Sequence, residues 1–190
     1  VRPGATPDVS TAESAVDGFM FTSKDQLQVV QFRLDGFTFS RLRPYQDWET
    51  LRAEARRLWE VYRAGVQPQA IRRAAVRYIN RLEVPLGEPL NAHLEIVPKP
   101  PSGFPERVTG YLQRQSLEDP KTGIAAFVTQ FMEPDPSATK LPVWLDIDVF
   151  RILGATIAEA ELWDILDMLA VAKNRIFFSS ISRRTLESLQ

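Results

Sequence analysis

The chain contains no cysteine, and among its 190 residues there is a single histidine, His93. The missing cysteines exclude disulfide frameworks, cysteine-ligated zinc and thiol catalysis. A single histidine also excludes metal clusters built from several imidazoles. A domain of this length buries roughly 70% of the surface that its unfolded chain exposes, so a core can form without disulfides or metals. We therefore expect a folded chain that needs no cofactor and no metal.

Charge of one sign is not in excess either. Lysine and arginine number 23 and the acidic residues 24, which gives a net charge of −1 and a pI near 6.0. This balance argues against a protein devoted to nucleic acid or to anionic membranes, although it is compatible with a local basic stripe. No apolar run approaches the length of a membrane span, and no signal peptide is visible. We expect a cytoplasmic protein with no membrane partner.

Motifs of common enzymes are also missing. The sequence has no P-loop, no dinucleotide-binding glycine fingerprint and no nucleophile elbow of hydrolases. What it has in quantity is aromatic residues: four Trp, eleven Phe and four Tyr. Many aromatic residues in a sequence without catalytic motifs favour a binding domain over an enzyme, and we predict no catalytic residue.

The first half of the chain predicts three strands and a helix. Residues 1–16 are rich in Pro, Gly, Ser and Thr and are expected to be irregular, whereas residues 17–190 are expected to form a single α+β domain. Strand patterns cover residues 18–23, 27–34 and 37–42. Asp35 and Gly36 separate the last two, as in a tight type I′ hairpin turn.

A helix is predicted after Pro44, with Asp47 as its N-cap and Gly65 just past its end. Its apolar residues recur at spacings of three and four and form one stripe. The members of that stripe are Trp48, Leu51, Ala55, Leu58, Trp59 and Tyr62. Two tryptophans and a tyrosine on one face make this the main packing helix.

The second half predicts four more strands and a C-terminal helix. Alternating patterns cover residues 71–84, 107–118, 123–133 and 142–150. The helix begins at the capping box of Thr156 and Glu159 and runs to about Phe178, and Ser182 is expected to cap a last short helix. The fold class is therefore α+β, a curved antiparallel sheet of about seven strands packed against the Trp-rich helix and the C-terminal helix.

The candidate site is a row of arginines on the strand over residues 71–84. Arg73, Arg77 and Arg81 are four residues apart, so they project from the same face of a strand. Such a row can hold phosphates or carboxylates. The alternative is a solvated face on which the arginines pair with Glu83, Asp146 and Asp148. Tyr78 is expected on the opposite face, which counts against nucleic-acid binding by stacking.

Further residues can extend this site. Arg41, together with Arg33 and Arg43, joins the row if its strand is a neighbour. Asp146 and Asp148 share one strand face, as a metal-binding pair would, but pairing with the arginines is the better interpretation because no third acidic ligand is nearby.

Several polar residues are expected to be structural. Asn80 and Asn174 lie inside apolar segments, where an amide normally satisfies backbone groups. His93 has no partner residues of the usual catalytic kind near it in the sequence.

Four motifs resemble those of a sporadically distributed, uncharacterised prokaryotic family. They are Pro44-Tyr45 with Trp48, Arg77-Tyr78-Ile79-Asn80, Asp146-Ile147-Asp148, and Lys173-Asn174 with Phe177-Phe178. The resemblance covers about Gly18 to the C-terminus. It implies no activity, because the family has none assigned.

The sequence thus leads to a protein of unknown function, expected to be a non-enzymatic domain that binds a small ligand or a protein. The alternative is an anion-binding or nucleic-acid-binding protein, or a metal-dependent enzyme, that uses the arginine row with Asp146 and Asp148. A homodimer is a third expectation, since unpaired edge strands invite pairing.

Overall fold

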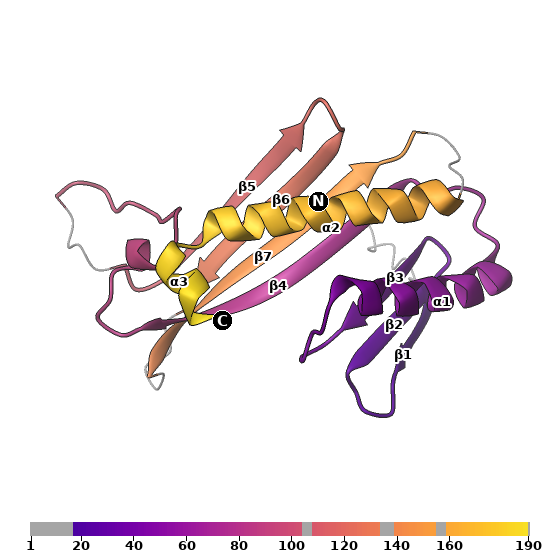
Figure 1. Ribbon diagram of the computed structural model, residues 1–190, viewed down its shortest axis with the longest axis horizontal. Helices are drawn as coiled ribbons and strands as arrows, with labels where there is room; N and C mark the ends of the chain where they lie inside the picture. Colours follow the sequence, from indigo (N-terminus) through magenta and orange to yellow (C-terminus); the bar gives the residue numbers. More distant parts are fainter. Residues whose placement is uncertain (1–16, 104–107, 134–138, 155–158, 190) are drawn as a thin grey trace, which may run out of the picture. The chain divides into compact units, whose positions relative to one another are not determined.

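The fold is α+β with antiparallel strand pairing, as the sequence predicts, but the strands form two sheets in place of the one sheet of about seven strands that we expected (Figure 1). The structure is a computed structural model and describes residues 17–103, 108–133, 139–154 and 159–189. Its seven strands are divided between a three-stranded and a four-stranded sheet. The chain separates into two compact units, residues 1–68 and residues 69–190, each with one sheet. A single domain over residues 17–190 stays a prediction.

The first unit is a meander with one helix. Strands β1 (Gly18–Thr22), β2 (Gln28–Arg33) and β3 (Gly36–Arg41) pair in that order, and α1 (Trp48–Val66) follows. Helix α1 packs its apolar stripe on β2 and β3. The rings of Phe32, Phe37, Trp59 and Tyr62 lie 5.5–5.9 Å apart between centroids, and the Tyr62 hydroxyl donates a hydrogen bond to the Arg33 carbonyl oxygen at 2.9 Å. This aromatic cluster holds the helix on the sheet.

The predicted start of α1 is confirmed and its predicted end is wrong. The Asp47 carboxylate accepts a hydrogen bond from the Thr50 N–H at 2.7 Å, as an N-cap does. The helix continues through Gly65 to Val66, and the left-handed residue at its C-cap is Gln67, with φ of 52°. Pro68 follows directly, and since proline cannot continue a helix it accounts for the later end.

The predicted type I′ turn at Asp35 and Gly36 is also wrong. Gly36 already pairs with Arg33 as the first residue of β3, so the two-residue loop is Leu34-Asp35. Neither loop residue has a positive φ, which a type I′ turn requires at both central positions.

The second unit is a four-stranded sheet covered by a long helix. The strands are β4 (Arg73–Pro85), β5 (Tyr111–Asp119), β6 (Ile124–Met132) and β7 (Lys140–Ile152), in the order β4-β7-β6-β5. A short 3-10 helix, η1 (Leu90–Ala92), follows β4, while α2 (Glu159–Ser180) and α3 (Arg183–Ser188) end the chain. Ser182 caps α3 as predicted. The predicted capping box of α2 includes Thr156, which lies outside the described residues.

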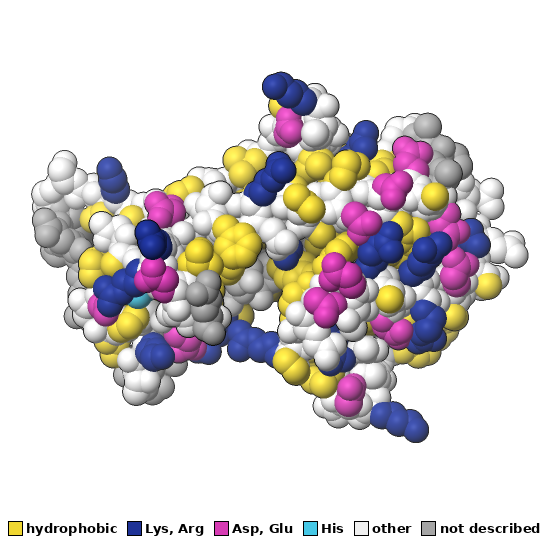
Figure 2. Space-filling model, viewed as in Figure 1, with side chains coloured by type: hydrophobic (Ala, Val, Ile, Leu, Met, Phe, Trp, Pro, Cys, Tyr) yellow, Lys and Arg dark blue, Asp and Glu magenta, His cyan; other side chains and the backbone are white. Residues whose placement is uncertain are grey.

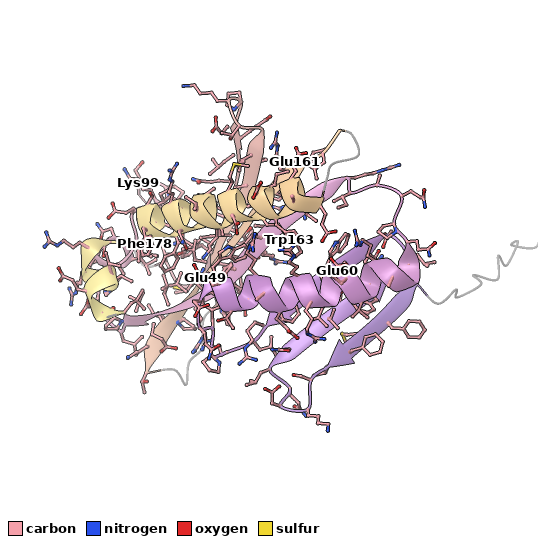
Figure 3. All side chains as sticks on the ribbon, turned by 45° about the vertical axis from the view of Figure 1, so that its right-hand side comes forward. Glu49, Glu60, Lys99, Glu161, Trp163 and Phe178 are labelled. Carbon is pink, nitrogen blue, oxygen red and sulfur yellow. The ribbon has the colours of Figure 1, made fainter. Side chains whose placement is uncertain are left out.

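Helix α2 runs along one face of this sheet, over β7 and β4 (Figure 1). Trp163 lies on one side of α2 and the exposed Glu161 on another (Figure 3). The core between helix and sheet consists of side chains that are at most 2% exposed: Val84, Val143, Leu145, Ile147, Val149, Ile165 and Leu169. The alternate β7 residues Val143, Leu145, Ile147 and Val149 thus form the buried face of that strand. No helix among the described residues is long and apolar enough to cross a membrane.

Candidate functional site

The sheet of the second unit has one face that none of the described helices of that unit covers. Side chains alternate along each strand, so the residues between the core positions project from the opposite face. We call this the uncovered face. Its basic and acidic side chains are Arg73, Arg77, Arg81 and Arg114, and Glu83, Glu118, Asp146 and Asp148, with Lys140 at a strand end. Its exposed aliphatic side chains are Ile79, Leu112 and Ile152, at 56%, 74% and 65% exposure.

The predicted row of arginines is present on this face, and its members are paired with carboxylates. Arg73 donates to both oxygens of Asp148, at 3.1 and 2.8 Å. Arg77 binds both oxygens of Asp146, at 2.8 and 2.5 Å, and Arg81 pairs with Glu83. The predicted ion pairs are therefore confirmed. The register of β4 with β7 makes the two cross-strand pairs diagonal: Arg77 lies opposite Asp148 but binds Asp146, which lies opposite Ile79.

These ion pairs weaken the case for an anion site. Asp146 and Asp148 are 15% and 23% exposed, so each holds its arginine at a partly buried position. The hydrogen bonds that Arg77 donates to Asp146 raise the pKa of Arg77. A phosphate would have to compete with Asp146, which binds two nitrogens of Arg77, and with Asp148, both of whose oxygens accept from one terminal nitrogen of Arg73. Arg41 lies in β3, in the sheet of the first unit, so strand pairing does not add it to the row.

The uncovered face also carries four aromatic residues that the sequence did not lead us to predict as part of a site. They are Phe127, Phe131, Trp144 and Phe150. Phe131 and Trp144 are directly opposite each other on β6 and β7, with rings 6.0 Å apart and 12° from parallel. Phe127 and Phe150 form a second pair at 5.1 Å. The alternation of side chains along β7 could have predicted two of them. It places Val143, Leu145, Ile147 and Val149 in the core, and therefore Trp144 and Phe150 on the other face.

Arginines and aromatic rings interleave across this surface. The guanidinium carbon of Arg73 lies 4.4 Å from the ring centroid of Phe150, and that of Arg114 lies 4.1 Å from Phe127. Arg81 lies 5.8 Å from Trp144. Tyr78, as predicted, is on the helix-covered side. Among the described residues, Arg114 and the strand-end Lys140 have no carboxylate partner, and Arg114 is the one that lies beside an aromatic ring of this face.

An open hollow of about 240 Å³ lies at the centre of the uncovered face. Its lining is mostly charged: Arg77, Arg114, Phe127, Thr129, Asp146 and Asp148. A smaller hollow of about 80 Å³ lies in the first unit, beside Tyr45 and Thr50. Neither of these two hollows is an enclosed apolar cavity.

Asp146 and Asp148 do not fit a metal site. Each carboxylate already binds a guanidinium through both oxygens. The described residues contain no group of three or more His, Asp or Glu side chains that could hold a metal ion. A cation would have to displace an arginine with too few ligands to replace it.

The Arg77–Asp146 pair should show measurable coupling. In a double-mutant cycle of Arg77→Ala and Asp146→Ala, we expect a coupling energy of about 1–2 kcal/mol from urea unfolding, because the pair is bidentate and one member is largely buried. The more exposed pair Glu54–Arg57 on α1 is the control, with an expected coupling below about 0.5 kcal/mol. Equal coupling in the two pairs would contradict this assignment.

His93 has partners, contrary to the sequence-based expectation. Its Nε2 lies 2.7 Å from a Glu88 oxygen and its Nδ1 3.2 Å from the Thr185 hydroxyl. The order of carboxylate, imidazole and hydroxyl resembles a hydrolytic triad. However, the Thr185 hydroxyl donates to the carbonyl oxygen of His93 at 2.9 Å, and Thr185 is only 5% exposed. The cluster therefore fastens α3 to the η1 segment and presents no nucleophile.

Lys173 is a buried cation on the helix-covered side. Its Nζ lies 3.5 Å from the ring centroid of Tyr78 and donates to the Asn174 side-chain oxygen at 2.7 Å. Burial lowers the pKa of Lys173 to about 8. The side-chain amide of Asn80 donates to the Leu145 carbonyl oxygen at 3.0 Å, which confirms the expected backbone contact. The exposed Asn174 instead accepts from the Lys173 side chain, so the same expectation is wrong for it.

Replacement of Lys173 should change how stability depends on pH. The folded state disfavours the charged amine, so between about pH 8 and pH 10.5 the unfolded chain binds more protons and wild-type stability rises with pH. We expect Lys173→Met to stabilise the protein by about 2 kcal/mol near pH 7, after allowance for the lost contact with Tyr78. The gain should shrink towards about pH 10. Urea unfolding across this range measures it, with the exposed Arg175→Met as control; a gain that does not change with pH would refute the assignment.

Comparison of the chain with family models, curated proteins and solved structures finds no match, so the resemblance to the sporadically distributed family stays a prediction.

Proposed function

We propose that this chain is a non-enzymatic protein-interaction domain that binds its partner through the uncovered face of β4, β7, β6 and β5. The observation that carries the proposal is the interleaving of arginine and aromatic side chains on a sheet face whose charges are nearly balanced. Arginine and tryptophan are the residues most enriched at the energetic centres of protein interfaces.

The exposed aliphatic side chains support a protein partner. Ile79, Leu112 and Ile152 are each more than half exposed and project from the same face as the aromatic rings. The register places them at three separate points around the aromatic rings, where each can add apolar contact area to one interface. The ion pairs of Arg73 and Arg77 hold side chains in place before a partner arrives, which lowers the entropy lost on binding.

The near balance of charges on the uncovered face favours a protein over a nucleic acid as the partner. The uncovered face carries nearly as many carboxylates as cationic groups, whereas nucleic-acid surfaces are strongly positive. Figure 2 draws the opposite side, on which α2 lies in front of the sheet, and basic and acidic side chains are interspersed there too. The aromatic rings beside Arg114 are the one feature that keeps single-stranded nucleic acid as an alternative.

The test compares variants of the uncovered face with matched variants elsewhere. Leu112→Asp and Arg114→Glu change the face, and Val171→Asp on α2 and Arg183→Glu on α3 make the same changes at other exposed positions. The full chain is used for affinity capture from a lysate of the source cells, and the captured protein is then purified and titrated by calorimetry. We expect Leu112→Asp to weaken binding at least about tenfold, with little effect of Val171→Asp.

Binding that survives both face variants would refute the proposal. A labelled oligothymidylate, titrated between about 50 and 200 mM salt, tests the alternative. Tight binding that falls steeply with salt and is lost in Arg114→Glu would favour nucleic acid over a protein.

A further inference from the structure

Strand β1 is an edge strand with apolar side chains exposed on both of its faces. It pairs with β2 along one edge, and no described strand pairs with the other. Phe19, Met20 and Phe21 are 66%, 67% and 51% exposed. The strand, GFMFT, carries no charge and no proline, the usual protections of an exposed edge.

The register shows which backbone groups of β1 are free. In an antiparallel pair, successive residues point their N–H and C=O groups alternately towards the neighbour and away from it. The Leu34 N–H donates to the Asp17 carbonyl oxygen, and the Ser23 N–H donates to that of Gln28. Asp17 and Ser23 therefore face β2, as do Phe19 and Phe21 between them, whereas Gly18, Met20 and Thr22 point their backbone groups outward.

We infer that β1 pairs with β1 of a second copy of this chain, antiparallel and with Met20 on the two-fold axis. In this register Gly18 lies opposite Thr22 of the second copy and Met20 lies opposite Met20. Every residue in these pairs is one whose backbone points outward, so all the free groups of the strand find partners. No proline interrupts them. A two-fold axis joins the same patch on both copies, as in most homodimers.

The side chains fit the same register. Phe19 of each copy lies opposite Phe21 of the other, in the pairs that make no ladder hydrogen bonds and whose side chains approach most closely. These aromatic pairs lie on the sheet face that carries α1, and the two Met20 side chains meet on the other face. No like charges meet, because the strand has none.

Helix α1 leaves room for this pairing. Its aromatic residues Trp59 and Tyr62 contact Phe32 and Phe37 on β2 and β3. Phe19 and Phe21 remain exposed beyond the helix, beside Phe32. Two meanders joined at β1 would then form one six-stranded sheet with both α1 helices on the same face.

The size of the contact predicts a weak dimer. The interface consists of one short strand and its apolar side chains from each copy, near the lower limit of about 1,000 Å² for specific association. We therefore expect dissociation in the micromolar range, visible as a concentration-dependent mass. A different protein could add a strand at this edge, but only a second copy matches the outward-facing residues and the two phenylalanines in one symmetric register.

Sedimentation velocity of the full chain over a concentration series is the first test. Met20→Pro removes an outward N–H from each copy and leaves the bonds to β2 intact, so the dimer should dissociate about 30-fold more readily or be lost. Arg41→Pro is the matched control, because β3 is the other edge strand of the same sheet. The Leu42 N–H donates to Leu27 beside β2, so the N–H of the preceding residue, Arg41, points away from β2, as that of Met20 does in β1. Met20→Lys, which sets two cations face to face, is the second variant if the proline impairs folding, as judged by circular dichroism.

Cysteine pairs test the register, because the natural chain has none. Phe19→Cys and Phe21→Cys chains, one of them tagged, are mixed and oxidised. Opposed positions of this type are about 4.5 Å apart between Cα atoms, within the range of a disulfide. We expect cross-linking between the two variants and much less within either alone.

A monomer at every concentration, a dimer unaffected by both Met20 variants, or one lost in Arg41→Pro alone would each overturn the inference. Cross-linking within single variants that equals that of the mixture would overturn the register. The outcome is independent of the proposed function, because no residue of the uncovered face is changed.

Discussion

Replacing Leu169 by alanine is expected to lower the free energy of unfolding by about 3–5 kcal/mol. Leu169 is fully buried on α2, between the helix and the sheet of the second unit. The substitution removes the transfer free energy of the side chain and leaves a cavity that the strands cannot close, since they are fixed by the ladder between β4 and β7. Urea unfolding followed by far-ultraviolet circular dichroism measures the change.

Val171→Ala on the same helix is the control for this experiment. Val171 is 52% exposed, and alanine has the higher helix propensity, so we expect a change within about 0.5 kcal/mol. A small effect of Leu169→Ala, similar to that of the control, would mean that α2 does not pack on the sheet as described.

Replacing Tyr62 by alanine should have the largest effect in the first unit, a loss of about 4 kcal/mol. Tyr62 is 3% exposed and contacts the rings of Phe32, Phe37 and Trp59. It is therefore the centre of the aromatic cluster that joins α1 to β2 and β3. Urea unfolding followed by far-ultraviolet circular dichroism measures the loss.

The Tyr62→Phe variant separates the contribution of the ring to stability from that of the hydroxyl. The hydroxyl donates to the Arg33 carbonyl oxygen, so its removal should cost about 1 kcal/mol, and the remaining loss belongs to the ring. Val61→Ala, at a position 52% exposed on the same helix, should have little effect. If Tyr62→Phe costs as much as Tyr62→Ala, the hydrogen bond rather than the ring packing would hold the helix.

On the uncovered face, ion pairing changes which kind of ligand a row of arginines is suited to bind. Three arginines spaced four residues apart along one strand indicate a possible anion site, yet each has a carboxylate partner on the same face. Pairing reduces the potential that a phosphate would meet and leaves planar guanidinium and aromatic groups for contact. This combination suits a protein surface, where geometric fit outweighs net charge.

Local patterns predicted the elements well. Alternation placed Arg73, Arg77 and Arg81 on one face, and the cap at Asp47 marked the start of α1. The predictions at Gly65 and at Asp35-Gly36 were wrong because a glycine permits a left-handed conformation without requiring one. At the end of α1 the position of Pro68 mattered more, and Gln67 adopted that conformation instead.

The aromatic half of the candidate site was harder to predict for a different reason. Phe127 and Phe131 come from β6, whereas Trp144 and Phe150 come from β7. Each strand alone shows only that these residues lie opposite the core positions. Their meeting with Arg73, Arg81 and Arg114 depends on the strand order β4-β7-β6-β5, which no single segment encodes.

By itself, the sequence determined the fold class, the kind and approximate bounds of each element, and the face on which each strand residue lies, because these follow from local periodicity and capping. Only the tertiary structure decided the division into two sheets, the partners of the arginines, the neighbours of His93 and the direction of the free backbone groups of β1. Those depend on register and strand order, which are set by contacts between segments far apart in the chain, where a shift of one residue exchanges the two faces of a strand.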